Sequence, residues 1–226
     1  MELTQSIENS LPLPIKEFIK GLEAWGRENR IDYPWRNEKR VFLRSITELL
    51  LRRTTAEAVH RRWGSVLSLS DPRKVSSMND SELRSTLRVF GLVSSRALEA
   101  RELAKAHLSK PINRRSYKNL LTLRGIGPYT AAAILTFICR KRVVMSDNNY
   151  ARVFGRVLGI DCRPSGVDLN GVLNKALPKS PSQFLRTNEA ILDFAKLVCR
   201  PSYPKCGSCY ANATCSYARS RLKTKS

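Results

Sequence analysis

The sequence predicts an all-α protein of roughly ten short helices. Apolar residues recur at helical spacing along nearly all of its 226 residues, and no strand-like alternation continues for more than a few residues. Residues that typically cap or begin helices stand ahead of several of these apolar segments. Helices are therefore the main secondary structure expected.

The predicted helices follow one another along the whole chain. Two apolar stripes begin the series, with Ile15, Phe18, Ile19, Leu22 and Trp25 in the first and Phe42, Ile46, Leu49 and Leu50 in the second. Asp71-Pro72 and Asn79-Asp80 then combine a cap residue with an early proline or acid, which is typical of helix starts. Further helices are predicted over 97–108, 117–123, 128–139, 148–158, 169–177 and 183–198.

The chain is strongly basic, with 40 Lys and Arg residues against 19 Asp and Glu residues and a formal net charge of +21. Such a field attracts polyanions, of which nucleic acid is the most common large partner, while an anionic membrane surface is the alternative. No apolar run approaches the ~20 residues of a membrane span, and residues 1–14 lack the pattern of a secretory signal. We therefore expect a cytoplasmic protein that binds nucleic acid and no membrane.

Four of the six cysteines are clustered with the spacing C-x6-C-x2-C-x5-C, at Cys199, Cys206, Cys209 and Cys215. Thiolates at this spacing can converge on one soft metal centre, either a zinc ion or an iron–sulfur cube. Either centre would be structural and would fix a loop that presents Arg200 and Lys205 to phosphate. The remaining thiols, Cys139 and Cys162, lie in apolar helical contexts and are predicted to be core residues.

A glycine hairpin between two helices is predicted in the segment LTLRGIGPYTAAAI, residues 121–134. Gly125 and Gly127 permit a tight turn, and Pro128 begins the next helix. Backbone N–H groups at a helix start can hold a phosphate. Many helix hairpins use glycine, so the motif alone is weak evidence of phosphate binding. It is stronger evidence here because the chain is basic and because an isolated acid, Asp147, follows the hairpin.

Asp147 stands immediately before a predicted helix, in the segment MSDNNYARV. An aspartate in this position is ordinarily an N-cap. Beside a phosphate held by the hairpin, however, it would face a sugar. Breaking an N-glycosidic bond builds positive charge on that sugar, and a nearby carboxylate stabilises this charge. We interpret Asp147 as a catalytic carboxylate, with a purely structural cap as the alternative.

Glu48 interrupts the apolar stripe of Ile46, Leu49 and Leu50. A carboxyl group at the margin of a core is expected to be paired, protonated or functional. The alternative is an exposed glutamate at the edge of the stripe, paired with a neighbouring arginine.

Together, these segments resemble the helix-hairpin-helix (Gly/Pro–Asp) superfamily of DNA glycosylases from about Tyr33 to Cys215. The resemblance implies a six-helix barrel domain over 35–141 and a second helical domain formed by 1–34 and 142–226, with the active-site cleft between them. It places Asp147 at the catalytic aspartate. It also makes the four clustered cysteines, in the loop 199–215, the ligands of a [4Fe–4S] cluster.

Tyr129, directly after the hairpin, distinguishes among subfamilies. Endonuclease III-like enzymes carry a lysine there that attacks C1′, and a phenol cannot form the Schiff base that this amine forms. The YPWR segment, the ITELLLRRTTA helix, Tyr129 and Glu48 together resemble the thymine/uracil mismatch glycosylases. Ser146 and Asn148 depart from those relatives, which have an apolar and a small residue there. The resemblance thus implies a monofunctional glycosylase for thymine or uracil opposite guanine.

The resemblance also implies contacts to DNA around the extruded nucleotide. Arg53, followed by Thr54, lies where the family inserts a wedge from one loop, and Leu92 lies where a second wedge enters beside the opposite base. For Leu92 the alternative is core packing. The amides of Gly125 and Gly127 would hold a phosphate. Extruding a base costs a few kcal/mol and costs least at a mismatch.

In the base pocket, Tyr129 would form a wall against the pyrimidine, and Glu48 would bond to or polarise the leaving base. Asn149 would orient Glu48 or water, Asp147 would support the sugar cation, and Trp35 would contribute to DNA binding. Two carboxyl groups with divided roles commonly break glycosidic bonds.

The expected partner is double-stranded DNA with a mismatched or damaged base, bound by a monomer at the nucleoid of a prokaryotic or archaeal cell. Two other functions remain open at this point. One is an adenine glycosylase acting opposite 8-oxoguanine or guanine, and the other is a non-catalytic iron–sulfur protein that binds DNA.

Overall fold

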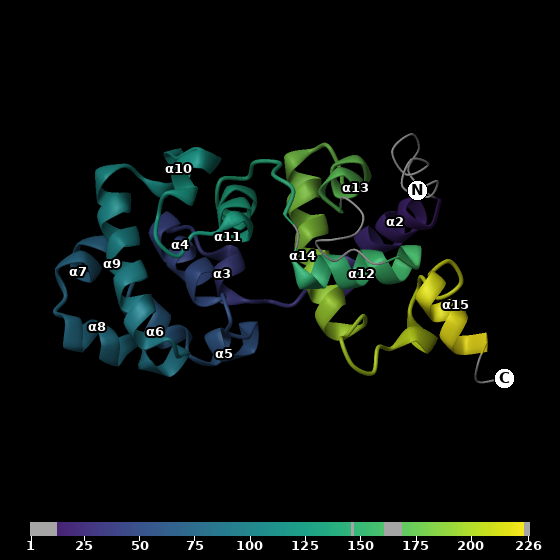
Figure 1. The fold of residues 1–226 in the computed structure, drawn as a ribbon, viewed down its shortest axis with the longest axis horizontal. Helices are drawn as coiled ribbons and strands as arrows, with labels where there is room; N and C mark the ends of the chain where they lie inside the picture. Colours follow the sequence, from purple (N-terminus) through teal and green to yellow (C-terminus); the bar gives the residue numbers. More distant parts are fainter. Residues whose placement is uncertain (1–12, 146, 161–168, 224–226) are drawn as a thin grey trace. The chain divides into compact units, whose positions relative to one another are not determined.

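The computed structural model describes residues 13–145, 147–160 and 169–223, and these residues form helices and no strands (Figure 1). The chain divides into two compact units. Asp32–Val143 forms one, here called the hairpin unit, and Met1–Ile31 with Val144–Ser226 forms the other, here called the cysteine unit. The sequence placed these boundaries at 34/35 and 141/142, and the cleft predicted between the two domains stays a prediction.

The hairpin unit is built around α4, which packs against α6, α9 and α11. Its apolar face is buried because Phe42, Leu43, Ile46, Leu49 and Leu50 recur at helical spacing. The α-helices of this unit are α3 (Pro34–Asn37), α4 (Val41–Leu50), α5 (Ala56–Arg61), α6 (Trp63–Leu67), α7 (Pro72–Ser77), α8 (Asp80–Leu87), α9 (Val93–Ser109), α10 (Tyr117–Leu121) and α11 (Pro128–Ala133). Short 3-10 turns, η1 (Arg88–Phe90) and η2 (Ile112–Arg114), precede α9 and α10.

Two predicted helix starts are confirmed by their caps. The side chain of Asp71 accepts a hydrogen bond from the backbone N–H of Arg73 at 2.8 Å, and Pro72 begins α7. The side chain of Asn79 accepts one from the backbone N–H of Glu82 at 2.8 Å, at the start of α8. Each cap satisfies a backbone donor that has no partner within the helix.

The helix predicted over 128–139 is regular only to Ala133. It continues as a π turn, η3 (Ile134–Ile138), in which the N–H of Cys139 bonds to the carbonyl of Ile134 at 3.1 Å. The guanidinium of Arg44, on α4, donates to the carbonyl of Phe137 at 2.5 Å. The periodicity of the sequence predicts the helix. It does not predict that this turn contains one residue more than an α-helical turn, a feature that contacts with α4 fix.

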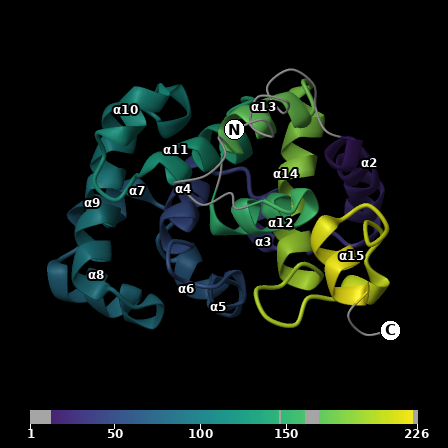
Figure 2. The same ribbon diagram turned by 45° about the vertical axis from the view of Figure 1, so that its right-hand side comes forward.

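The cysteine unit consists of α2 (Leu13–Glu28), α12 (Asn148–Leu158), α13 (Leu169–Ala176), α14 (Pro181–Leu197), the 3-10 turn η4 (Cys206–Ser208) and α15 (Ser216–Lys223). α2 packs along α14, and α12 contacts α2, α14 and α15 (Figure 2). Phe18 of α2 lies at the centre of an aromatic core, edge-on to Phe154 and Phe194 and stacked on Tyr210 with 5.7 Å between ring centroids. The Tyr210 hydroxyl donates to the Phe18 carbonyl at 2.9 Å, so α2 anchors the cysteine loop.

Helix number is the main difference from the sequence prediction. The described residues contain fourteen α-helices, α2 to α15, whereas roughly ten were expected. Several of these, such as α3 with four residues and α6 with five, are too short to give a periodic signal in a window of 11 or more residues. In the part of the chain that the structure describes, no helix has both the length and the apolar character needed to cross a membrane.

Candidate active site

Asp147 is half-buried and serves as the N-cap of α12. Its Oδ1 accepts hydrogen bonds from the backbone N–H groups of Asn149 at 2.8 Å and Tyr150 at 3.0 Å. Its Oδ2 accepts a third from the Asn149 side-chain amide at 2.9 Å. These bonds hold the carboxyl group in one orientation at the start of a helix. The predicted cap is thus present, and capping is compatible with a catalytic role. Ser146 lies outside the described residues.

Asn149 connects Asp147 to the cysteine loop through Arg152. The Asn149 side-chain oxygen accepts from Arg152 Nη2 at 2.9 Å, while its amide nitrogen donates to Asp147. Arg152 Nε in turn donates to the carbonyl of Cys199 at 2.8 Å. Within this unit, Asn149 therefore orients Asp147. The predicted contact between Asn149 and Glu48 joins residues of different units and stays a prediction.

The four clustered cysteines line one mainly apolar cavity in the cysteine unit. Its walls also include Phe18, Val153, Val157, Phe194 and Val198. Among the described residues, no three His, Cys, Asp or Glu side chains are arranged as ligands of a single metal ion. The four cysteines nevertheless line the same cavity.

The chemistry of these thiols fits a positively charged metal group. Burial raises the pKa of Cys209 and of Cys215, and the charges of the neighbouring cysteines raise it further. Unliganded thiolates at Cys209 and Cys215 would therefore be unfavourable, and a metal group bonded to these sulfurs would offset that cost. The backbone N–H of Ala211 approaches Cys209 Sγ at 3.4 Å, and Arg156 Nη1 approaches Cys199 Sγ at 3.5 Å. Both contacts stabilise negative charge on sulfur.

Arg156 fixes the start of the cysteine loop from α12. Its guanidinium donates to the carbonyls of Arg200 at 2.6 Å and Pro201 at 2.9 Å, and it lies over the ring of Tyr217 at 4.6 Å. Arg200 and Lys205, predicted to face phosphate, are both exposed. Outside the loop, Cys139 is half-buried at the end of the π turn, and burial raises its pKa. Cys162 lies outside the described residues.

Glu48 is half-buried in the last turn of α4. Burial raises the pKa of Glu48 to about 7, and the opposing effects of the Arg44 and Arg36 charges are smaller. A substantial fraction of Glu48 is therefore protonated near neutral pH. The alternative of an exposed, ordinary surface glutamate does not fit this environment, and a carboxyl group of this kind can donate a proton or a hydrogen bond.

The hairpin contains one glycine that its backbone requires and one that it does not. Gly125 has φ +79°, in the left-handed region that favours glycine. Gly127 has φ −85° and is the N-cap of α11, with open space where a Cβ would lie. Tyr129 is half-buried in the first turn of α11.

Two exposed residues on neighbouring loops adopt the left-handed conformation although neither is glycine. Arg53 (φ 56°) lies between α4 and α5, and Leu92 (φ 49°) immediately precedes α9. Leu92 is 51% exposed, which excludes the core alternative. Backbone conformations of this kind are uncommon in residues other than glycine and cluster at functional sites.

Two of the predicted DNA-contacting residues, Thr54 and Trp35, have partners within the hairpin unit. Thr54 is half-buried and its hydroxyl donates to the carbonyl of Phe90 at 3.3 Å. Trp35 is 7% exposed, stacks on Tyr33 with 4.4 Å between ring centroids, and packs against Trp63. A direct contact between Trp35 and DNA is not supported by this burial. YPWR instead supplies an aromatic core for the hairpin unit.

The sequence interpretation missed the buried charges of α9. Arg96 and Glu99 are 2% and 8% exposed, and they interrupt the apolar face formed by Ala97, Ala100 and Leu103. The argument that singled out Glu48, a charge within an apolar stripe, would have identified them as well.

Known proteins similar to this chain include two archaeal enzymes and a solved structure. The sequence is 30% identical over 206 residues to the thymine/uracil-DNA glycosylase of Methanothermobacter thermautotrophicus, covering 89% of this chain and 93% of the relative. It is 31% identical over 194 residues to the thymine-DNA glycosylase of Aeropyrum pernix, covering 82% and 86%. The structure of a thermostable thymine-DNA glycosylase matches with a TM-score of 0.79 at 27% identity, over 92% of this chain and 97% of that chain. No family model matches.

The fold, the hairpin and these relatives define the class of the protein, an enzyme that removes bases from DNA. The chain belongs to the helix-hairpin-helix superfamily of DNA glycosylases.

Proposed function

We propose that this chain is a monofunctional glycosylase that removes thymine or uracil opposite guanine and leaves an abasic site. The observation that carries the proposal is its identity of 30% or more, over most of its length, to relatives named for thymine and uracil. Tyr129, which the sequence resemblance links to the same subfamily, agrees with this substrate class, whereas the acid at Glu48 is one that the adenine glycosylases share. The proposed partner is duplex DNA, bound by a monomer with a net charge of +21.

Two carboxyl groups divide the work in the proposed reaction. Asp147, held by three N–H donors, stabilises positive charge on the deoxyribose as the bond to the base breaks. Glu48, whose pKa burial raises to about 7, donates a proton or a hydrogen bond to the departing pyrimidine. The base must first leave the helix, and a G·T or G·U mismatch reduces the cost of this step.

The proposed absence of strand-nicking lyase activity rests on Tyr129. A lyase of this superfamily needs an amine after the hairpin to form a Schiff base with C1′, and a phenol has no such chemistry. Water is then the group that attacks the sugar, and the product is an intact strand with an abasic site.

The proposed cofactor is a [4Fe–4S] cluster held by Cys199, Cys206, Cys209 and Cys215. When bound, it supplies a covalent cross-link between the end of α14 and the loop 206–215. Arg152 and Arg156 hold the same loop to α12, at whose start Asp147 stands. The loop thereby contributes to the position of the catalytic carboxylate.

A panel of duplex oligonucleotides tests the substrate and the chemistry together. Duplexes with T·G, U·G, A·8-oxoguanine and undamaged pairs are incubated with the protein, treated with or without alkali, and resolved by length. We expect alkali-dependent cleavage at T·G and U·G only. Borohydride should trap no covalent adduct, because Tyr129 cannot form an imine.

Asp147→Asn is the control for this panel. Asparagine can cap α12 as aspartate does, so the fold should be preserved while turnover is lost and DNA affinity is kept. Product from A·8-oxoguanine alone would contradict the proposed substrate. A borohydride adduct, or cleavage without alkali, would contradict the proposed monofunctional chemistry.

A further inference from the structure

The Arg96 side chain is buried beneath the two loops that carry Arg53 and Leu92. Arg96 lies in the first turn of α9 and is 2% exposed. Residues 51–55, between α4 and α5, are here called the first loop, and residues 90–92, leading into α9, are called the second loop. Arg96 is among the largest fully buried side chains of the described residues, and its charge needs hydrogen-bond partners.

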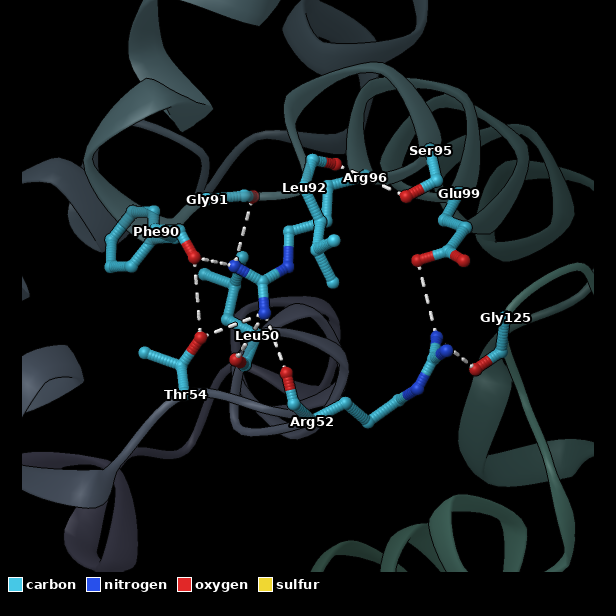
Figure 3. A network of polar contacts seen from close by, with 10 residues as sticks. All are labelled: Leu50, Arg52, Thr54, Phe90, Gly91, Leu92, Ser95, Arg96, Glu99 and Gly125. Atoms are coloured by element: carbon cyan, nitrogen blue, oxygen red, sulfur yellow. Dashed lines mark hydrogen bonds and ion pairs between the residues drawn. The ribbon is translucent and has the colours of Figure 1, made fainter.

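The two terminal nitrogens of Arg96 donate hydrogen bonds to different loops (Figure 3). Nη1 donates to the carbonyls of Phe90 and, at 3.1 Å, Gly91 in the second loop. Nη2 donates to the carbonyl of Arg52 at 2.5 Å and to the Thr54 hydroxyl at 2.7 Å in the first loop. It also reaches the Leu50 carbonyl, at the end of α4, at 3.3 Å. One planar guanidinium therefore bridges the two loops, which the Thr54 hydroxyl also links directly by its bond to the Phe90 carbonyl.

The residues held by Arg96 are the immediate neighbours of Arg53 and Leu92, two of the four described residues other than glycine that have a positive φ. Arg52 and Thr54 flank Arg53, and Gly91 precedes Leu92. A left-handed conformation in a residue other than glycine persists only where its surroundings impose it. The bonds from Arg96 supply that restraint on both sides of Arg53 and immediately before Leu92.

A second set of contacts links the first loop to the hairpin. Arg52 Nη1 bonds to Glu99 Oε2 at 3.1 Å and donates to the carbonyl of Gly125 at 2.5 Å (Figure 3). Glu99 lies on α9, one turn after Arg96. At Gly125 a Cβ atom would lie 2.5 Å from Glu99 Cδ, so the hairpin backbone approaches this pair closely. The three segments are thus joined by contiguous polar contacts that centre on α9.

We propose that Arg96 is a positioning residue for base extrusion. Arg96 holds Arg53 and Leu92 at a fixed separation, so that both side chains enter the DNA helix together. The inference rests on the proposed function in requiring an extruded base, but it does not depend on which base is removed. Arginine suits this role because its fork of donors can bond to both loops at once, whereas a lysine ammonium is a single point of contact.

Arg96→Lys tests the proposal, and α9 offers a matched control. Arg101 also donates to two backbone carbonyls, those of Ser76 at 3.3 Å and Met78 at 2.7 Å, but it holds the α7–α8 connection rather than the two loops. Both lysine variants are made in an Asp147→Asn background, so that no base is removed. A 2-aminopurine beside the target base reports extrusion through loss of stacking, and fluorescence anisotropy reports DNA affinity.

We expect Arg96→Lys to lower the extruded fraction about fivefold, the scale of losing one or two hydrogen bonds, with little change in affinity. Arg101→Lys should leave extrusion unchanged, although it should lower the unfolding temperature about as much as Arg96→Lys does. Normal extrusion by Arg96→Lys, or equal losses in both variants, would overturn the proposal. Should Arg96→Lys fail to fold, Thr54→Val decides the question, because it removes the bonds of the Thr54 hydroxyl to Arg96 and to the Phe90 carbonyl, and Thr54→Ser, which keeps the hydroxyl, is its control. Unchanged extrusion in Thr54→Val would also overturn the proposal.

The proposed function and the proposed role of Arg96 can fail independently. If the oligonucleotide panel identifies another target base, the substrate proposal is wrong, and the extrusion assay is then performed with that base. Its outcome still tests only the role of Arg96.

Discussion

Asp147 and Glu48 are both half-buried carboxyl groups on helices, but their surroundings suit them to different tasks. Asp147 stands at a helix start and accepts three N–H hydrogen bonds, which fix its orientation. Glu48 lies in the last turn of α4, where burial outweighs the charges of Arg44 and Arg36 and raises its pKa to about 7. Carboxyl groups whose environments differ in this way commonly act as an electrostatic stabiliser and an acid.

The raised pKa of Glu48 predicts the pH dependence of base excision. A group with a pKa of about 7 is protonated below that pH and loses its proton above it. If Glu48 is the proton donor, the single-turnover rate should be constant below about pH 7 and fall about tenfold per pH unit above it. Glu48→Gln should be slower and should lack this descending limb. A rate that rises through pH 7 would instead show that the ionised form is active.

At the scale of elements, the two glycines of the hairpin should differ in their tolerance of a side chain. Gly125 has φ +79°, and an added Cβ would displace Glu99 and Arg52 from their ion pair. Gly125→Ala should therefore lower the free energy of unfolding by about 1–3 kcal/mol. Gly127 has φ −85° and open space around it, so Gly127→Ala should change this free energy by less than about 0.5 kcal/mol. Urea unfolding of the two variants measures the difference, and equal losses would contradict the assignment.

Those elements that follow from local pattern could be predicted from the sequence. The helix predicted over 148–158 is α12, Asn148–Leu158, because the Asp147 cap and its apolar spacing are both local signals. The contacts of Arg96 could not be predicted, since its partner Arg52 is 44 residues away along the chain and only the packing of α4 against α9 brings them together. The burial of Trp35 arises in the same way, from stacking on Tyr33 and contact with Trp63. Spacing identifies charged or aromatic residues, but tertiary packing decides which are structural.

At the scale of the whole molecule, the chain combines a strongly basic charge with a unit that contains the cysteine loop. The loop contacts several helices of its unit: Tyr210 packs on Phe18 of α2 and on Phe194 of α14, and Arg152 and Arg156 hold the loop to α12. The net charge of +21 favours DNA binding. A metal group bonded to all four thiols would add covalent links to the contacts that hold the loop.

The proposed cluster therefore predicts both a composition and a local effect of its loss. The purified protein should contain about four irons per chain and absorb broadly in the visible range. Cys206→Ser should lose iron and unfold at a lower temperature, whereas Cys139→Ser, which changes a half-buried thiol outside the loop, should keep it. In Cys206→Ser, hydrogen exchange should accelerate in residues 198–215 and remain slow in α4 and α9, because those helices belong to the hairpin unit. A colourless protein with one zinc ion, or equal iron in both variants, would contradict the assignment of these cysteines to an iron–sulfur cluster.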